Sequence, residues 1–212
     1  MDCSRFIVVE GSEGAGKSTA IKLIKNLLEE QGQTVTLARE PGGTPMAEDL
    51  RTVIKSASVD EVVDPRTELL IMYAARVQLV ENVIRPALER GEWLVCDRFF
   101  YSTWAYQGGG RELGLELIRP IHDICLADMI PGLTIFMDLD PELGLERARG
   151  RGALDRFELE QIDFFHRTRA MYTELCDERK EMQKLDASQS MQEVHADLLN
   201  LIRPYIDQNQ DL

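Results

Sequence analysis

The sequence predicts an α/β fold in which a five-stranded, mostly parallel sheet is flanked by helices on both faces. Short apolar runs alternate with amphipathic stretches from one end of the chain to the other. The apolar runs are rich in β-branched residues, which suits strands buried in the centre of a sheet. Gly32 and Gly91 follow two of the amphipathic stretches, where glycine commonly ends a helix.

The expected strands are the short apolar runs, of which the last has the weakest pattern: Phe6–Val9, Thr34–Ala38, Trp93–Cys96, Leu133–Leu139 and Met182–Leu185. The stretches between them combine helical spacing with strong helix formers. The expected helices are Lys17–Gln31, Met46–Lys55, Arg66–Arg90, Leu113–Leu126, Pro141–Arg149, Glu158–Lys180 and Gln189–Ile206.

The chain has 212 residues, the length of one domain that can bury its own core. It contains no internal repeat, low-complexity block or Pro/Ser-rich linker, so we expect a single domain over residues 1–212. One segment differs in composition from the rest. Glu146 to Arg156 is basic and interrupted by glycines, although the protein as a whole is acidic.

The formal net charge of −13 argues against nucleic acid or an anionic membrane as a partner. The four cysteines and three histidines are scattered, without the spacing of a metal site. The first apolar run, Phe6–Val9, is too short for a signal sequence or a membrane span. We therefore expect a cytoplasmic protein that binds neither nucleic acid nor membrane.

A phosphate-binding motif follows the first expected strand and precedes the first expected helix. Its residues are Gly11, Ser12, Glu13, Gly14, Ala15, Gly16, Lys17 and Ser18, followed by Thr19, and they match G-x-x-x-x-G-K-[ST]. Glycines let backbone N–H groups surround phosphate oxygens, and the helix N-terminus adds partial positive charge. Lys17 is expected to reach the β- and γ-phosphates, and the Ser18 hydroxyl to bind Mg²⁺. The motif predicts a nucleoside triphosphate site in a P-loop NTPase fold, the alternative being a glycine turn with an incidental lysine.

Asp97 and Arg98 follow the third expected strand, at the sheet edge where open α/β sheets bind ligands. Asp97 is a candidate to hold Mg²⁺-bound water or to orient an acceptor, and Arg98 to bind a phosphate. An ordinary salt bridge is the alternative. The D-x-x-G and N-K-x-D motifs of GTPases do not occur in the sequence, which favours a kinase over a GTPase.

Four segments together resemble thymidylate kinases over nearly the whole chain. They are Glu10 to Thr19, Arg39-Glu40-Pro41-Gly42-Gly43-Thr44, Tyr73-Ala74-Ala75-Arg76, and Asp97-Arg98 continuing to Ala105-Tyr106-Gln107-Gly108-Gly109-Gly110-Arg111. The resemblance implies transfer of the γ-phosphoryl of ATP to dTMP with Mg²⁺, giving dTDP and ADP. It also implies a homodimer. An enzyme of the same scaffold with another acceptor and a P-loop NTPase switch remain the alternatives.

On the acceptor side, the resemblance implies that Arg39, Arg51 and Arg98 surround the dTMP phosphate, and planar guanidinium groups suit phosphate oxygens. Glu40 would orient that cluster or Mg²⁺-bound water. Glu13 would bind the sugar 3′-hydroxyl, the alternative being a solvated loop carboxylate.

Around the base and sugar, Arg76 would donate to thymine O4, and Thr103, on one helical face with Gln107, would meet N3. Tyr106 would pack at the 2′ position and exclude a ribose hydroxyl, unless it is only a core aromatic. Many relatives have a stacking Phe four residues before the base-reading arginine. This chain has Met72 there, with Tyr73 beside it.

Some relatives carry a catalytic arginine in the P-loop, where this chain has glycine and alanine. The chain resembles the bacterial subtype that carries arginines in a mobile lid, here about residues 147–157, so Arg149 and Arg151 are the catalytic candidates. A solvated surface loop is the alternative. Arg147 would face adenine, and the loop at Asp186 and Ala187 would contact the ATP base.

Overall fold

Five parallel strands form the centre of the computed structural model, which describes residues 1–56, 61–126, 129–149 and 155–209. The strands are β1 (Phe6–Glu10), β2 (Val35–Arg39), β3 (Trp93–Asp97), β4 (Leu133–Asp138) and β5 (Met182–Asp186). Their order across the sheet is β2-β3-β1-β4-β5, and every pairing is parallel. The prediction of the sheet is confirmed, and each strand lies within two residues of its expected bounds.

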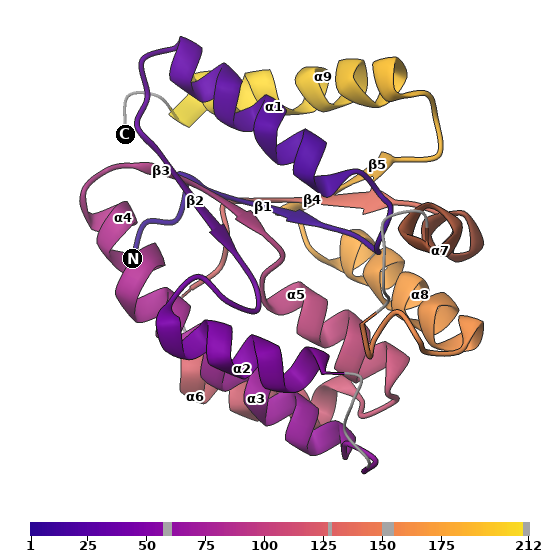
Figure 1. The fold of residues 1–212 in the computed structure, drawn as a ribbon. Helices are drawn as coiled ribbons and strands as arrows, with labels where there is room; N and C mark the ends of the chain where they lie inside the picture. Colours follow the sequence, from indigo (N-terminus) through magenta and orange to yellow (C-terminus); the bar gives the residue numbers. More distant parts are fainter. Residues whose placement is uncertain (57–60, 127–128, 150–154, 210–212) are drawn as a thin grey trace.

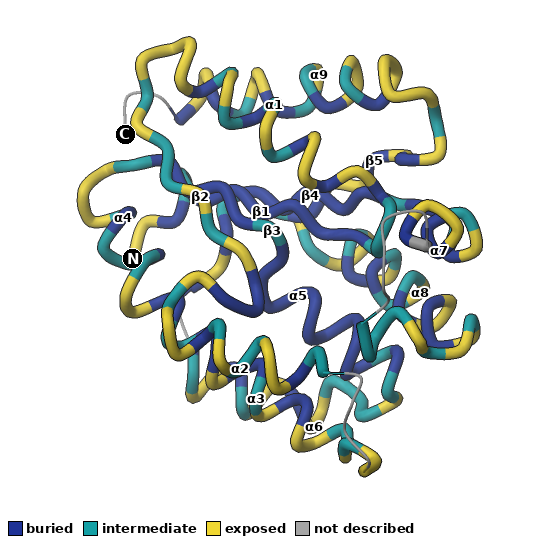
Figure 2. Tube along the Cα trace, viewed as in Figure 1, coloured by how far each residue is buried: buried dark blue, intermediate teal, exposed yellow. Residues whose placement is uncertain are grey.

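Helices cover both faces of the sheet (Figure 1). One face carries α1 (Lys17–Glu30) and α9 (Met191–Asn209). The other carries α2 (Pro45–Lys55), α3 (Pro65–Leu79), α4 (Arg85–Glu89), α5 (Phe100–Thr103), α6 (Leu115–Leu126) and α8 (Ile162–Glu178), and α7 (Pro141–Arg149) lies near the end of the strands. Figure 2 shows the strands buried between the two layers and the outer helix surfaces exposed.

Side chains of β1 alternate between two cores because successive residues of a strand face opposite sides. Ile7 and Val9 pack with Ile24 of α1 and Ile202 of α9. Phe6 and Val8 belong to the core under the other helical layer. Strands buried on both faces explain why the sequence showed continuous apolar runs instead of an alternating pattern.

The expected helix Arg66–Arg90 is interrupted, which corrects the sequence interpretation. Helix α3 ends at Leu79, a π-helical turn η1 spans Val80–Ile84, and α4 follows. Pro86, in the first turn of α4, has no N–H to donate and its ring would collide with the carbonyl four residues earlier. A π turn widens the backbone there and accommodates the proline.

The expected helices also omitted Phe100–Gly110, which the structure shows as α5 followed by a π-helical segment η2 (Trp104–Gly110). Only Thr103 and Gln107 were expected to share a helical face in this segment, and the three successive glycines that follow lower helix propensity. Packing accounts for them, since a Cβ on Gly109 would lie 2.7 Å from the Met171 Cβ and one on Gly110 2.6 Å from the Phe164 ring. Gly109 and Gly110 therefore allow α8 to approach closely. Helix α8 itself begins at Ile162 instead of the expected Glu158.

Candidate active site

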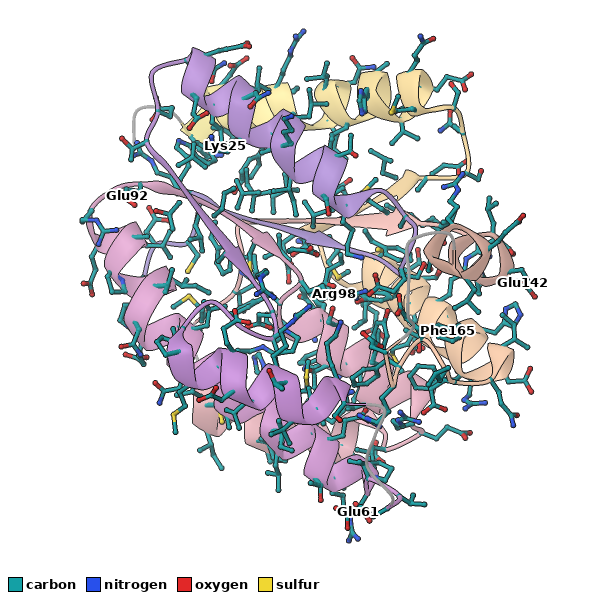
Figure 3. All side chains as sticks on the ribbon, in the orientation of Figure 1. Lys25, Glu61, Glu92, Arg98, Glu142 and Phe165 are labelled. Carbon is teal, nitrogen blue, oxygen red and sulfur yellow. The ribbon has the colours of Figure 1, made fainter. Side chains whose placement is uncertain are left out.

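A cavity of about 350 Å³ opens beside the carboxyl ends of β1, β2 and β3. Most of the predicted site residues line it: Glu13, Gly14, Gly16, Lys17, Ser18, Thr19, Arg39, Glu40, Arg51, Met72, Asp97, Arg98, Tyr106, Gln107 and Arg147. Figure 3 shows Arg98 in the interior of the molecule, whereas Glu61 and Glu142 lie at its periphery. One cavity thus joins the phosphate-binding loop to the arginine cluster.

The loop between β1 and α1 requires glycine at several positions. Gly11 and Gly14 have φ angles of 140° and 78°, which disfavour other residues. A Cβ on Gly11 would lie 2.7 Å from the Met137 carbonyl oxygen of β4. Lys17 folds back over this loop, and its Nζ donates to the carbonyls of Gly11 and Ser12 at 3.0 Å each. These contacts fix the ammonium group at the cavity wall.

Burial, aided by the charge of Arg98, lowers the pKa of Lys17 to about 8, although Glu13, Asp97 and Glu10 favour its charged form. The ammonium is therefore a cation that its surroundings stabilise incompletely. An anionic group entering the cavity would supply the missing stabilisation.

Ser18 and Asp97 offer the oxygen atoms that a hard divalent cation prefers. Ser18 is exposed at the start of α1, and Asp97 Oδ1 is buried without a hydrogen-bond partner in the described part of the chain. The same described residues hold no group of three or more His, Cys, Asp or Glu placed to bind a metal. The pair suits Mg²⁺, which keeps several waters and shares phosphate oxygens, better than a cation held mainly by protein.

Arg98 has a left-handed backbone, with φ of 69°, at the end of β3. Its NH2 donates to Glu13 at 2.9 Å and to the Tyr106 hydroxyl at 3.1 Å, and its NH1 donates to Ser102 Oγ at 3.3 Å. The guanidinium also lies 5.0 Å from the centre of the Tyr106 ring. A residue with this strained conformation persists only where its surroundings fix it.

Glu10 provides much of that fixation, and sequence analysis did not identify it as a site residue. Its fully buried carboxylate accepts the N–H groups of Phe99 and Ser102 at 2.9 and 3.1 Å. It also accepts the Ser102 hydroxyl at 2.5 Å and the Tyr172 hydroxyl at 2.7 Å. Burial raises the pKa of Glu10, whereas Arg98 and these donors oppose the rise. In the sequence Glu10 directly follows the expected strand Phe6–Val9, so its local pattern did not distinguish it from an exposed acid.

Arg39 and Arg51 reach the cavity from β2 and α2. Arg39 pairs with Glu48 at 2.8 and 2.9 Å, and Arg51 NH1 donates to the Pro41 carbonyl at 2.7 Å. Lys55, which sequence analysis missed, is a further cation on the lining. It follows Arg51 by one helical turn, and that spacing could have revealed it.

Another part of the cavity is less charged, with Met72, Tyr106, Gln107 and Phe157 on the lining. Phe157 lies in the expected lid of residues 147–157 but was not predicted as a site residue. The other three were predicted.

Several predicted site residues have buried polar atoms without a hydrogen-bond partner among the described residues, including Gln107 Oε1 on this lining, Arg76 NH1 and Thr103 Oγ1. Buried polar atoms normally have partners, so the Gln107 oxygen on the lining suits a hydrogen-bond donor of a ligand. Arg76 and Thr103 do not line the cavity themselves. Tyr73 also does not, and its ring lies 6.3 Å from that of His122 in the core.

Glu40 pairs with Arg76 at 2.7 Å, and both side chains are almost completely buried. Burial raises the pKa of Glu40 to about 7, although Arg76 opposes the rise. Glu40 therefore contacts Arg76, the predicted base-reading arginine. Other groups pair with the predicted phosphate-binding residues Arg39, Arg51 and Arg98.

Arg147 of α7 links the loop to the end of β5, because its NH1 donates to the carbonyls of Gly14 and Ala187 at 3.4 Å each. Ala187 and Asp186 lie in the turn after β5, where Asp186 accepts the Ser188 N–H at 2.9 Å. Of the predicted lid arginines, Arg151 and the side chain of Arg149 lie outside the described residues.

Comparison with known proteins identifies the family. A family model described as thymidylate kinase matches residues 9–198. The chain belongs to the thymidylate kinase family. The thymidylate kinase of Pseudoalteromonas translucida is 51% identical over 201 residues, which are 95% of this chain and 96% of that protein. That of Vibrio vulnificus is 47% identical over 212 residues and the full length of both chains.

A solved thymidylate kinase, from Ehrlichia chaffeensis, has the same fold, with a TM-score of 0.74 at 27% identity over 93% of this chain and 97% of that one. The thymidylate kinase family assignment favours a phosphotransferase over a regulatory NTPase. No helix in the described segments is both long and apolar enough to cross a membrane.

Proposed function

We propose that this chain transfers the γ-phosphoryl group of ATP to dTMP, giving dTDP and ADP. One observation carries the proposal beyond family membership. Lys17 of the P-loop and the three arginines Arg39, Arg51 and Arg98 line the same cavity. Two separate phosphate-binding groups in one cavity suit a transfer between two nucleotides better than simple hydrolysis.

On the donor side, the backbone of residues 11–19 and the start of α1 bind the ATP phosphates. Lys17 contacts the β- and γ-phosphates and stabilises the negative charge of the transferring group. Arg147, Asp186 and Ala187 contribute to the adenine end. When bound to Ser18 and to Asp97, directly or through water, Mg²⁺ neutralises phosphate charge.

On the acceptor side, Arg39, Arg51 and Arg98 hold the dTMP phosphate so that its oxygen can attack. Glu13 accepts the sugar 3′-hydroxyl, and Tyr106 blocks the 2′ position. The buried atoms that have no hydrogen-bond partner among the described residues support a proposal for base recognition. Arg76 NH1 donates to thymine O4, and Thr103 Oγ1 accepts from thymine N3. Gln107 Oε1 is a further acceptor for the base. Met72 packs on the ring.

Two further proposals rest on the sequence. Arg149 and Arg151, in the proposed lid of residues 147–157, supply positive charge to the transferring group. Replacing each with alanine should lower kcat strongly while the Kd for ATP changes little, and two variants with normal kcat would contradict this.

We also propose that the chain is a single domain, that it is cytoplasmic and that it forms a homodimer. Light scattering can test the homodimer.

The decisive experiment measures ADP formation with and without dTMP. We expect turnover that depends on dTMP and on Mg²⁺, with weaker use of dUMP and of thymidine. ADP release that does not increase with any nucleoside monophosphate would contradict the proposal. Faster turnover with another nucleoside monophosphate would still support a kinase, but one with a different acceptor.

A further inference from the structure

Glu68 of α3 is a completely buried carboxylate with partners from two other parts of the chain. Its Oε1 accepts Gln107 Nε2 of η2 at 2.6 Å. Its Oε2 accepts Arg156 NH2 at 2.7 Å, and Arg111 Nε lies 3.2 and 3.3 Å from the two oxygens. A buried charge with this many matched donors forms a rigid network, because each bond would be costly to leave unmade.

The first contact determines how Gln107 is oriented. An ionised carboxylate can only accept, so the Gln107 amide must present its NH2 group to Glu68. The amide carbonyl Oε1 is then directed elsewhere, and it is buried without a partner among the residues described. Since Gln107 lines the cavity, Glu68 leaves an acceptor atom available beside the proposed thymine site.

The second contact helps to hold Phe157, whose N–H also donates to Asp155 Oδ1 at 2.9 Å. Arg156 is held at its NH2 by Glu68 and at its Nε by the Ile54 carbonyl, 2.9 Å away. Its guanidinium lies 4.5 Å from the centre of the Phe157 ring. Phe157 in turn lines the cavity and meets the Tyr106 ring at an angle of 82°, with the centroids 6.3 Å apart.

We infer that Glu68 is a positioning residue for the acceptor base: it acts through Gln107 on one wall of the cavity and through Arg156 and Phe157 on another. It does not line the cavity itself. The inference rests on the proposed function, since it assumes that the acceptor base enters this part of the cavity. Among the described residues, the side-chain partners of Glu68 are Gln107, Arg111 and Arg156, none of which belongs to the P-loop. We therefore expect the KM for dTMP to change and the KM for ATP to remain unchanged.

The test compares Glu68→Gln with the wild-type enzyme, both confirmed as folded by circular dichroism and thermal melting. Loss of the charged contacts should raise the KM for dTMP about 10-fold, the effect of one charged hydrogen bond, and leave the KM for ATP within about twofold. Glu81→Gln is a matched control, because Glu81 pairs with Arg85 on the surface of the same helical stretch. It should leave both constants unchanged.

A double-mutant cycle tests whether the effect passes through the proposed partners. In a Gln107→Ala background, Glu68→Gln should raise the KM for dTMP by clearly less than it does alone. Arg156→Gln should also raise the KM for dTMP and leave the KM for ATP unchanged. It serves as a second test if Glu68→Gln fails to fold, because Glu68 then keeps Arg111 as a charged partner. Equal changes in both KM values, or full additivity with Gln107→Ala, would overturn the inference. Wild-type enzyme without dTMP-dependent turnover would overturn the proposed function instead.

Discussion

Glu13 and Arg98 form an ion pair of 2.9 Å that joins the P-loop to the carboxyl end of β3. Burial opposes the charge on Glu13, but Arg98, Lys17 and Lys55 outweigh it and hold its pKa well below the ordinary value. Arg98 therefore faces the cavity with its NH2 already donating to Glu13 and Tyr106, and its NH1 to Ser102. Any acceptor phosphate would bind to its remaining donors.

We predict that Glu13→Gln weakens dTMP binding more than ATP binding. The amide keeps the size of the side chain but is a poorer acceptor for a sugar hydroxyl and a poorer partner for Arg98. Equilibrium binding of each nucleotide measures the difference. Equal loss of affinity for both would assign Glu13 to the ATP side.

The same pair makes stability depend on pH in a definite direction. Because the folded-state pKa of Glu13 is depressed, its stabilisation is present above the unfolded value of 4.5 and is lost as pH falls through the lower folded value. The free energy of unfolding should therefore decrease below pH 4.5 more steeply in the wild type than in Glu13→Gln. Parallel curves from urea unfolding would contradict this.

For Lys17 we predict that Lys17→Met folds but loses about 10²-fold or more in kcat, since it removes charge stabilisation of the transferring group.

The native pKa of Lys17, about 8, lies below the ordinary 10.5, so the unfolded state binds more protons between these values. Lys17 should therefore make wild-type stability rise with pH from about 8 to 10.5, and the rise should be smaller in Lys17→Met. ATP binding at pH 9 should take up a proton, which calorimetry in two buffers can detect.

The sequence predicted the sheet and the P-loop well because local patterns determine both. A strand buried on two faces is apolar throughout, and the loop needs glycines at fixed positions. It placed Thr103 and Gln107 on one helical face but did not reveal the π-helical segment η2, because glycines lower helix propensity and packing against α8 determines the backbone there. Nor could it reveal that Glu40 pairs with Arg76, since the two are distant in sequence and meet only in the fold.

The roles of Glu10 and Glu68 were missed for a related reason. A buried carboxylate in a strand or helix has the same local pattern as a surface one. What distinguishes it is the set of donors that other elements bring, such as Tyr172 for Glu10 and Arg156 for Glu68.

We predict that Glu10→Ala destabilises the protein by about 3 kcal/mol or more, because several buried donors lose their acceptor together. Glu10→Gln should cost less, since its amide oxygen can still accept the backbone N–H groups of Phe99 and Ser102. Chemical unfolding of the three proteins provides the values. A loss below about 1 kcal/mol in Glu10→Ala would mean that water replaces the carboxylate.

The final prediction concerns Tyr106 and the choice between deoxyribose and ribose. Tyr106 is nearly buried, its ring packs beside Phe157 and Phe164, and its hydroxyl accepts from Arg98 at 3.1 Å. If the ring blocks the 2′ position, Tyr106→Ala should narrow the preference for dTMP over its ribose analogue. Removing the ring also frees Arg98, so binding of both nucleotides should weaken and only the ratio of their kcat/KM values is informative.

Tyr106→Phe separates the steric effect from the effect on Arg98, because it keeps the ring and loses only the hydrogen bond with Arg98. We expect Tyr106→Phe to keep the wild-type preference and Tyr106→Ala to reduce it at least about 10-fold, since a steric block worth 1.4 kcal/mol changes the ratio by that factor. An unchanged ratio in a folded Tyr106→Ala would mean that the ring is only part of the core and that another group excludes the ribose hydroxyl.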